Sequence, residues 1–350
     1  MKRQMEIFKM KFRLKYIILS LIFIIAGVAN TNAQVEKEAQ SGFRFLSNPV
    51  SAEAMGRGAT GVVNTFNSNA IFWNPALISF NERTVDVSLN YTKSIADINY
   101  SAGAASIQIG SFGVIGLSLL AMDYGTFYGT VRAANEQGYI ETGTFSPSAL
   151  AAGLTFSSKI SDRFSYGVQF KYAHQDLKSA MVTISGDSLS DPNLSLAERR
   201  YKTDVYALDV GAFYDFRFKG IKFGAVLQNI SEEVSYENEE FPLPFSISFG
   251  ASIKPLTFLN DNETSNALQL NFESVHPRDF NEKVKIGAEY NYLNTFIIRA
   301  GYVFNYDERN WTAGLGLRQE ISDFPLRVDY AFEPFGVLGN RHFISVGFSY

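Results

Sequence analysis

Cysteine is absent from the chain of 350 residues. Its absence excludes disulfide bonds and a lipid anchor attached through cysteine, and it argues against a structural zinc site. The three histidines, His174, His276 and His342, are far apart and follow no metal-ligand spacing. No acid–base pair, nucleophile elbow or calcium loop is recognisable, so we expect no enzyme, metal site or cofactor.

Charge and long apolar runs are also scarce. Charged residues make up 19% of the chain, below the roughly 25% of typical globular domains. Beyond residue 33 no apolar run approaches the ~18 residues of a membrane-spanning helix. Residues 1–33 hold six of the 31 basic and one of the 35 acidic side chains, which leaves a net charge of −9 on the remainder. A chain without a basic patch is not expected to bind nucleic acid.

The N-terminus has the three parts of a secretory signal peptide. Basic residues from Lys2 to Lys15 precede an apolar stretch, Ile17–Ala29, and the small residues of Thr31-Asn32-Ala33 follow it. The apolar stretch is short for a membrane-spanning helix, so a signal anchor is the less favoured alternative. We predict a signal peptide over residues 1–33, cleaved after Ala33.

What the chain has in abundance is aromatic residues, 15% of the total, in segments that alternate between apolar and small or polar positions. The last ten residues show this best. Four apolar residues there share one face of a strand: Ile344, Val346, Phe348 and Tyr350. A chain that ends on such a strand resembles the assembly signal of bacterial outer-membrane barrels.

Alternation of this kind predicts fourteen strands between residues 84 and 350. An even number of antiparallel strands that closes on itself leaves no free edge in lipid. We therefore expect an all-β fold, a transmembrane antiparallel barrel surrounded by outer-membrane lipids of a Gram-negative cell. Short joins such as Gly110-Ser111 and Leu293-Asn294 are expected on the periplasmic side. Longer polar joins are expected outside: Tyr124–Thr144, Asp176–Lys202, Ser231–Leu243, Leu256–Asn266 and Phe335–Asn340.

Residues 34–83 lack the alternating pattern of barrel strands. Their apolar side chains need burial, but Asn74-Pro75 interrupts the most apolar stretch. Irregular backbone at membrane depth is tolerated where protein surrounds it, so we predict a hatch or plug inside the lumen, with helical turns at Ala52–Met55 and Asn69–Trp73. The expected hatch motif comprises Gly56, Gly58, Gly61, Phe72, Trp73, Asn74, Pro75 and Ala76.

This segment resembles the start of the PorV/PorQ family, in the wider FadL-like group of outer-membrane proteins. The resemblance covers Phe45 to Leu77 and rests on the glycine-rich stretch Met55–Ala59 and on Asn74-Pro75-Ala76. It implies a fourteen-stranded barrel with an N-terminal hatch. For the PorV/PorQ branch it implies type IX protein secretion, in which members bind the C-terminal signal domain of cargo proteins.

Two functions follow from the resemblance. The first is a binding or shuttle component of type IX secretion, whose partners would be cargo, the translocon or surface attachment proteins. The alternative is a FadL-like channel for long-chain fatty acids or other hydrophobic compounds, with a ligand in the lumen. The resemblance favours secretion, whereas the residues themselves do not distinguish the two.

Overall fold

A computed structural model describes residues 40–350, except 133–135, 186–194, 259–265, 307–308 and 322–323. The predicted signal peptide lies outside the described residues. Within the described part of the chain, no helix is long and apolar enough to cross a membrane.

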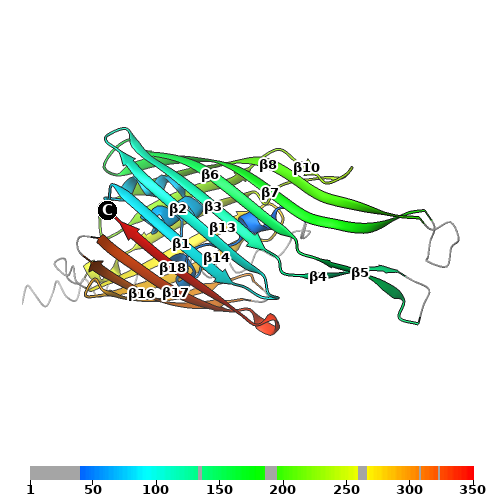
Figure 1. Cartoon of the computed structure of the whole chain (residues 1–350). Coiled ribbons are helices and arrows are strands. Elements are labelled where there is room, and N and C mark those ends of the chain that lie inside the picture. Colours follow the sequence, from blue (N-terminus) through cyan, green and yellow to red (C-terminus); the bar gives the residue numbers. More distant parts are fainter. Residues whose placement is uncertain (1–39, 133–135, 186–194, 259–265, 307–308, 322–323) are drawn as a thin grey trace, which may run out of the picture. The chain divides into compact units, whose positions relative to one another are not determined.

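Fourteen antiparallel strands form a closed barrel in which the first strand, β1, pairs with the last, β18. Each predicted strand overlaps one of them, so the predicted fold class is confirmed (Figure 1). The barrel strands are β1 (Val85–Lys93), β2 (Asn99–Ile109), β3 (Gly113–Asp123), β6 (Ser148–Lys159), β7 (Phe164–Ser185), β8 (Ser195–Asp215), β9 (Lys222–Ile230), β12 (Ser246–Ile253), β13 (Asn266–Pro277), β14 (Lys283–Tyr292), β15 (Phe296–Val303), β16 (Trp311–Ile321), β17 (Phe324–Pro334) and β18 (Asn340–Ser349).

Alternate residues of each strand face opposite sides of the wall. In β18 the side chains of Arg341, Phe343 and Ser345 are buried, whereas Ile344 and Val346 are exposed. Phe348 and Tyr350 are exposed as well, so the apolar face of the C-terminal strand points away from the lumen. The outer wall is apolar, as lipid requires.

Two expected outer loops are instead β-structure. Residues 124–144 contain most of a separate hairpin, β4 (Phe127–Arg132) with β5 (Tyr139–Phe145). β7 and β8 continue past their last barrel partners and remain paired with each other as far as Ser185 and Ser195. These hairpins project from one end of the barrel (Figure 1). We name them the outer hairpins. A short ladder, β10 (Val234–Ser235) with β11 (Glu240–Phe241), lies in a third expected loop.

The prediction that the join Leu256–Asn266 lies on the outer side is wrong. The described start of Leu256–Asn266 belongs to a short 3-10 helix, η4 (Pro255–Phe258), which lies at the end of the short turns, because Lys254 N–H donates to Lys219 O in the β8–β9 turn at 2.9 Å. Strand direction alternates round an antiparallel barrel, so the end on which a join lies depends on strand order and not on its length. The β17–β18 join at the other end holds η5 (Gly336–Leu338).

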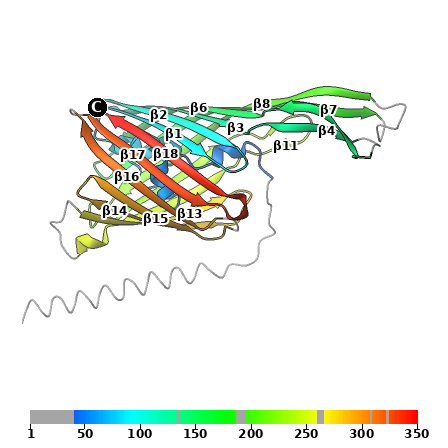
Figure 2. The ribbon, with the colours of Figure 1, turned by 60° about the horizontal axis from the view of Figure 1, so that its bottom comes forward.

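Residues 41–81, which we name the lumen segment, lie inside the barrel (Figure 2). They form η1 (Arg44–Ser47), a one-turn helix, α2 (Ala52–Gly56), and two further 3-10 helices, η2 (Ser68–Phe72) and η3 (Pro75–Phe80). α2 contacts β15 to β18, whereas η3 contacts β3 and β6 to β8. A short segment that touches opposite walls must cross the interior. The two helical turns match those expected from the sequence.

Candidate functional site

Buried ion pairs cover the inner face of β13 to β18 and β1, which we name the charged wall. Arg299 is fully buried and bonds to Glu289 at 2.6 Å and to Asp329 at 2.7 Å. Arg57, from the lumen segment, joins Glu289 at 2.7 Å and Glu53 at 3.2 Å. Every carboxylate in this chain of contacts bonds to at least one guanidinium. Such pairing offsets the cost of removing the charges from water.

The charged wall also holds the backbone of the lumen segment. Glu273 accepts from Gly61 N–H at 3.0 Å and from Val62 N–H at 3.1 Å. Lys285, paired with Glu273 at 2.8 Å, donates to Ala59 O at 3.0 Å. These contacts satisfy backbone groups that have no strand or helix partner of their own.

Glycine allows the closest approach between the segment and this wall. Gly58 has φ +72°, a backbone conformation that glycine adopts without strain. A Cβ atom on Gly301 of β15 would overlap the backbone nitrogen of Gly58. Gly56 lies in the same way against Gly314. Two of the predicted motif glycines therefore lie backbone to backbone against the charged wall.

The Asn74-Pro75-Ala76 part of the motif lies on the opposite side of the lumen. Asn74 Nδ2 donates to Val62 O at 3.0 Å and to Ala212 O of β8 at 3.1 Å, and its Oδ1 accepts from Ala76 N–H at 3.1 Å. Pro75 starts η3 where no N–H donor is needed. The interruption seen in the sequence is thus the start of a capped helix.

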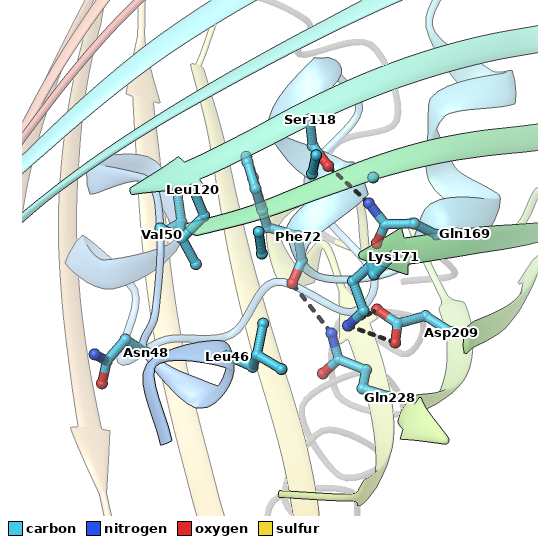
Figure 3. Close-up of a pocket in the computed structure, with 13 residues that line it drawn as sticks. Leu46, Asn48, Val50, Phe72, Ser118, Leu120, Gln169, Lys171, Asp209 and Gln228 are labelled. Carbon is cyan, nitrogen blue, oxygen red and sulfur yellow. Dashed lines mark hydrogen bonds and ion pairs between the residues drawn. The ribbon is translucent and has the colours of Figure 1, made fainter. Parts of the chain in front are cut away.

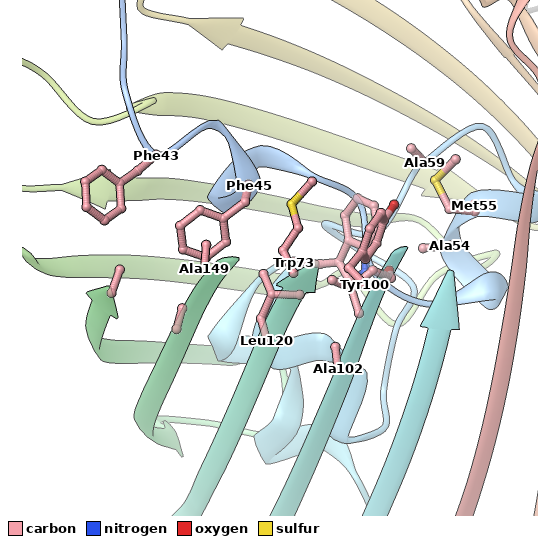
Figure 4. Packing of buried hydrophobic residues seen from close by; sticks show 14 of the residues in the cluster. Phe43, Phe45, Ala54, Met55, Ala59, Trp73, Tyr100, Ala102, Leu120 and Ala149 are labelled. Atoms are coloured by element: carbon pink, nitrogen blue, oxygen red, sulfur yellow. The ribbon is translucent and has the colours of Figure 1, made fainter. Parts of the chain in front are cut away.

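Trp73 and Phe72 lie between the two sides, and Gly61, bound to the charged wall, contacts the Trp73 ring. Trp73 Nε1 donates to Val50 O at 3.0 Å, and its ring lies where a Cβ on Gly61 would be. The indole belongs to a buried apolar cluster with Phe43, Phe45 and Met55 (Figure 4). The structure therefore separates the predicted motif into a wall-bound part, a capped turn and a central aromatic pair.

The inner face of β2, β3 and β6 to β9, which we name the small-residue wall, is different in character. Its buried residues are mostly alanine, serine and glycine, with a few larger apolar side chains. Among the described residues of this wall, one buried ion pair occurs, between Lys171 and Asp209 at 2.7 Å. This wall therefore carries much less charge than the charged wall.

Two adjoining cavities remain between the lumen segment and the walls. The smaller, about 40 Å³, reaches the small-residue wall at Leu120, Ala151 and Lys171 (Figure 3). The larger, about 120 Å³, extends toward Arg44, Tyr306 and the joins at the outer end. They share five lining residues: Leu46, Asn48, Val50, Phe72 and Gln228. The two cavities therefore adjoin at Phe72, and we call the two together the passage.

Cations and aromatic rings surround the outer end of the larger cavity. Lys283 Nζ lies 3.6 Å from the centroid of the Tyr306 ring, and the Arg309 guanidinium lies 4.0 Å from it. Burial alone would raise the pKa of the Tyr306 phenol, but the charges of Arg309 and Lys283 outweigh burial and lower this pKa to about 7. Arg44 lies over Phe280 at 4.6 Å.

A groove of about 670 Å³ separates the two outer hairpins. Its lining includes Tyr128, Thr130 and Thr142 from the β4–β5 hairpin, and Ser179 and Met181 from β7. The side chain of Tyr128 is largely exposed. The groove is separate from the lumen cavities, since it shares no lining residue with them.

The three histidines do not come together. His174 bonds to Asp204 at 2.6 Å, His342 bonds to Tyr330 at 2.8 Å, and both lie on the outer face of the barrel. His276 is on β13. In the described residues, no group of three histidine or acidic side chains could hold a metal ion.

The charged wall and the residues at the outer end of the larger cavity are not predicted from the sequence. Arg299, Glu289 and Asp329 are single charges on three different strands, and nothing in their spacing links them. Their position in the alternation of each strand could have indicated the charged wall. Each charged residue shares its side of the strand with a glycine or an alanine. A charge in that register of a membrane strand faces the lumen.

No protein-family model matches the sequence, and no curated protein matches it. Solved structures are similar in fold. The Ralstonia pickettii toluene transporter TbuX has a TM-score of 0.57 at 14% identity, over 89% of this chain and 98% of its own. The Pseudomonas putida toluene transporter TodX has a TM-score of 0.57 at 12% identity, over 90% and 98%.

A Pseudomonas aeruginosa FadL homologue has a TM-score of 0.56 at 11% identity, over 87% of this chain and 98% of its own. At such low identity the likeness concerns the fold and not the ligand. The chain has the fold of the FadL-type outer-membrane barrels.

Proposed function

We propose that this chain is a non-enzymatic barrel of the Gram-negative outer membrane that admits small hydrophobic compounds through its lumen. The observation that carries the proposal is the pair of adjoining cavities beside Phe72, which run from the outer end of the barrel to the small-residue wall. Apolar side chains, among them Leu46, Val50 and Phe72, line both cavities together with polar and charged groups. Apolar linings combined with placed polar groups are typical of small-molecule sites. Two of the similar structures are described as toluene transporters, which supports the same class of compound.

The size of the passage favours compact compounds over long chains. A dry cavity of roughly 150 Å³ is enough to bind benzene. The larger cavity, at about 120 Å³, is close to that size, and the smaller one adds about 40 Å³. A long-chain fatty acid would require displacement of the lumen segment, which the charged wall opposes.

Filling the smaller cavity tests the proposal. Ala151 lines that cavity from β6, and Ala151→Phe would occupy it. We expect cells producing this variant to take up labelled toluene several-fold more slowly than cells producing the unmodified chain. The matched control is Ala300→Phe, because Ala300 is exposed on the outer face of β15. Equal uptake by cells with the unmodified chain, the Ala151→Phe variant and no chain at all would contradict transport.

The outer hairpins favour a second candidate function, docking of a secreted protein as in type IX secretion. β7 and β8 extend well past the barrel and remain paired with each other as far as Ser185 and Ser195. The groove of about 670 Å³ between the hairpins is larger than either lumen cavity. The resemblance of residues 45–77 to the PorV/PorQ family supports this candidate, whereas the similar structures do not bear on it.

Trimming the outer hairpins distinguishes the two candidates. We expect removal of β7 beyond Gln175 and of β8 before Thr203 to abolish pull-down of a cargo C-terminal signal domain, if docking is the function. Toluene uptake should remain, since the lumen cavities contain no residue of the trimmed part. Co-purification in mild detergent would show a translocon or a surface attachment protein. Retained cargo binding after all the outer joins are trimmed would exclude docking there.

A further inference from the structure

The groove between the outer hairpins has the size of a ligand site and well-defined sides. Its volume is about 670 Å³, within the roughly 300–1,000 Å³ that small-molecule sites occupy. Residues of β4 and β5 line one side and residues of β7 line the other, with Glu198 of β8 (Figure 1). Because all but one of the lining residues belong to paired strands, backbone ladders hold the two sides in place.

The middle of the β4–β5 hairpin forms a flat floor. Gly129 lies directly opposite Gly143, so neither strand has a side chain at this position of the ladder. Gly143 has φ +104°, and a Cβ atom there would meet no atom within 4 Å. Tyr128, which is 76% exposed, follows this floor along the groove. An uncovered aromatic ring next to bare backbone gives a flat ligand a surface on which to lie.

Hydroxyl-bearing residues and glycine make up most of the lining. Seven of the thirteen lining residues are threonine, serine or glycine. Four of these have hydroxyl groups without a hydrogen-bond partner in the described part of the chain: Thr130, Thr142, Thr144 and Ser179. A hydroxyl group both donates and accepts hydrogen bonds. The groove therefore offers several unused donors and acceptors to a ligand.

Two charged residues line the groove, and one of them is unpaired. Lys178 Nζ lies 3.2 Å from Asp176 Oδ2, which also receives Arg200 at 2.6 Å. Glu198 has no ion-pair or hydrogen-bond partner among the described residues. A carboxylate accepts hydrogen bonds through two oxygens and repels anions. The groove therefore favours a neutral ligand that carries several hydrogen-bond donors.

We propose that the groove between the outer hairpins binds a neutral sugar chain. A sugar ring carries hydroxyl groups round its edge and C–H groups on its faces. The C–H groups would pack on Tyr128, because the face of an aromatic ring is electron-rich. The ring hydroxyls would bond to Glu198 and to the unused hydroxyls of the groove. This site is separate from the lumen, so it adds a second ligand class to the proposed uptake.

The lining suits a docked protein less well. Cores of protein interfaces are rich in aromatic residues, methionine and arginine and poor in serine. Three of the thirteen lining residues are of these enriched types: Tyr128, Phe145 and Met181. Capture of a protein is therefore the competing outcome of the experiment.

Binding of the purified full chain to immobilised sugars tests the proposal. The probes are maltohexaose, mannohexaose, hexagalacturonate and the polysaccharide released from the lipopolysaccharide of the cells that carry this chain, compared by biolayer interferometry. An amine-oxide detergent is required, because the headgroup of a maltoside is itself a sugar. We expect binding to a neutral hexasaccharide or to the polysaccharide, and weaker binding to hexagalacturonate. A hexasaccharide that binds would identify a dissolved sugar, whereas binding to the polysaccharide alone would identify a chain of the cell's own surface.

Two substitutions in the groove sharpen the test. Tyr128→Ala should weaken sugar binding about tenfold, as for loss of an aromatic anchor, whereas Tyr128→Phe keeps the ring and should retain binding. Glu198→Gln should weaken it about fivefold, because hydrogen bonds to charged groups are the stronger ones. Glu198→Gln preserves side-chain volume, so it carries the test if Tyr128→Ala fails to give a heat-modifiable barrel on gels. The matched control is Tyr139→Ala, since Tyr139 is 42% exposed on β5 and does not line the groove.

Absence of binding to every sugar probe would overturn the assignment, as would unchanged binding in both Tyr128→Ala and Glu198→Gln. Tighter binding to hexagalacturonate than to the neutral probes would also overturn it. Capture of a cargo signal domain that is lost in Tyr128→Ala, without sugar binding, would assign the groove to protein docking instead. Toluene uptake should be equal in all these variants, because the lumen cavities share no residue with the groove. The sugar site and the proposed uptake therefore fail separately.

Discussion

The charged wall and the small-residue wall face the same lumen segment and contact it in different ways. On the charged wall, Arg57 of the segment enters a row of ion pairs, and Gly58 lies against Gly301 with no side chain between them. On the small-residue wall, contact is concentrated at η3, and the smaller cavity remains beside Phe72. The charged wall holds the segment through ion pairs, whereas the small-residue wall holds it through neutral contacts.

The difference follows from the cost of burying charge. Each buried ion loses several kcal/mol of hydration, so paired charges stabilise a structure little but are costly to break. A segment bound through such pairs cannot leave without exposing unpaired charges. The apolar and hydroxyl contacts of the small-residue wall carry no comparable penalty. Movement of the segment would therefore begin at the small-residue wall.

Arg299→Met should have the largest effect, because it disrupts the charged wall at its centre. The guanidinium is fully buried and serves both Glu289 and Asp329. Removing one partner of a buried ion pair costs about 3–5 kcal/mol. We expect a fall of this size in the free energy of unfolding in detergent, measured by urea titration. Arg199→Met, at an exposed pair, should leave this free energy unchanged within the error of the titration.

Gly301→Ala should displace the lumen segment by steric overlap. The added methyl group would meet the backbone of Gly58, which has no flexible side chain that could move aside. Overpacking of this kind costs about 1–3 kcal/mol. We expect faster proteolysis of residues 41–81 in the folded barrel. Gly103→Ala is the control, since the nearest atom there is 3.5 Å away, on the outer wall. Equal proteolysis of both variants would contradict the close approach.

Pro75→Leu tests the other side of the segment. It removes the fixed backbone angle at the start of η3, a loss of about 0.4–1 kcal/mol. We expect a higher pore conductance in planar bilayers, with the barrel still heat-modifiable on gels. Unchanged conductance and unchanged folding would mean that Asn74-Pro75 does not hold a hatch closed.

A smaller effect is expected from pH, at the outer end of the larger cavity. The pKa of Tyr306 in the folded protein, about 7, lies below the ordinary value of 10. As pH rises, the folded protein therefore releases this proton at a lower pH than the unfolded chain does. Its contribution to stability is complete above pH 10 and is lost as pH falls through about 7. Phenolate absorbance that titrates near pH 7 should vanish in Tyr306→Phe. A midpoint that remains near 10 would contradict the arrangement.

Strand positions could be predicted from the sequence because lipid imposes alternation on every strand that it contacts. The stretch Phe164–Tyr172 illustrates this: its aromatic residues face outward, and Ser165, Gln169 and Lys171 face the lumen. The far parts of β7 and β8 extend past the barrel wall, so lipid is not expected to impose alternation on them. Glu198-Arg199-Arg200 therefore reads as a loop although it is paired strand.

The interior of the lumen could be predicted only in part. Asn74-Pro75 marks an irregular segment, and the apolar residues around it require burial, so a lumen location follows from the sequence. The partners of that segment do not follow. Arg57 and Glu289 are 232 positions apart. Lys171 bonds to Asn229 beside a shift in the β8–β9 register, which no residue pattern predicts. Such contacts depend on barrel closure and register, which local propensity does not encode.

Closure of the barrel between β1 and β18 has a consequence for assembly. α2 is near the start of the described chain, yet it contacts β15 to β18, which are the last strands to be synthesised. These contacts span most of the chain, and contacts of long sequence separation form late. Once Asp86 pairs with Ser349 and Lys93 with His342, the wall has no open edge at that seam. We therefore expect the lumen segment to be enclosed before β1 pairs with β18. Its final contacts would then form only when the last strands of the barrel are in place.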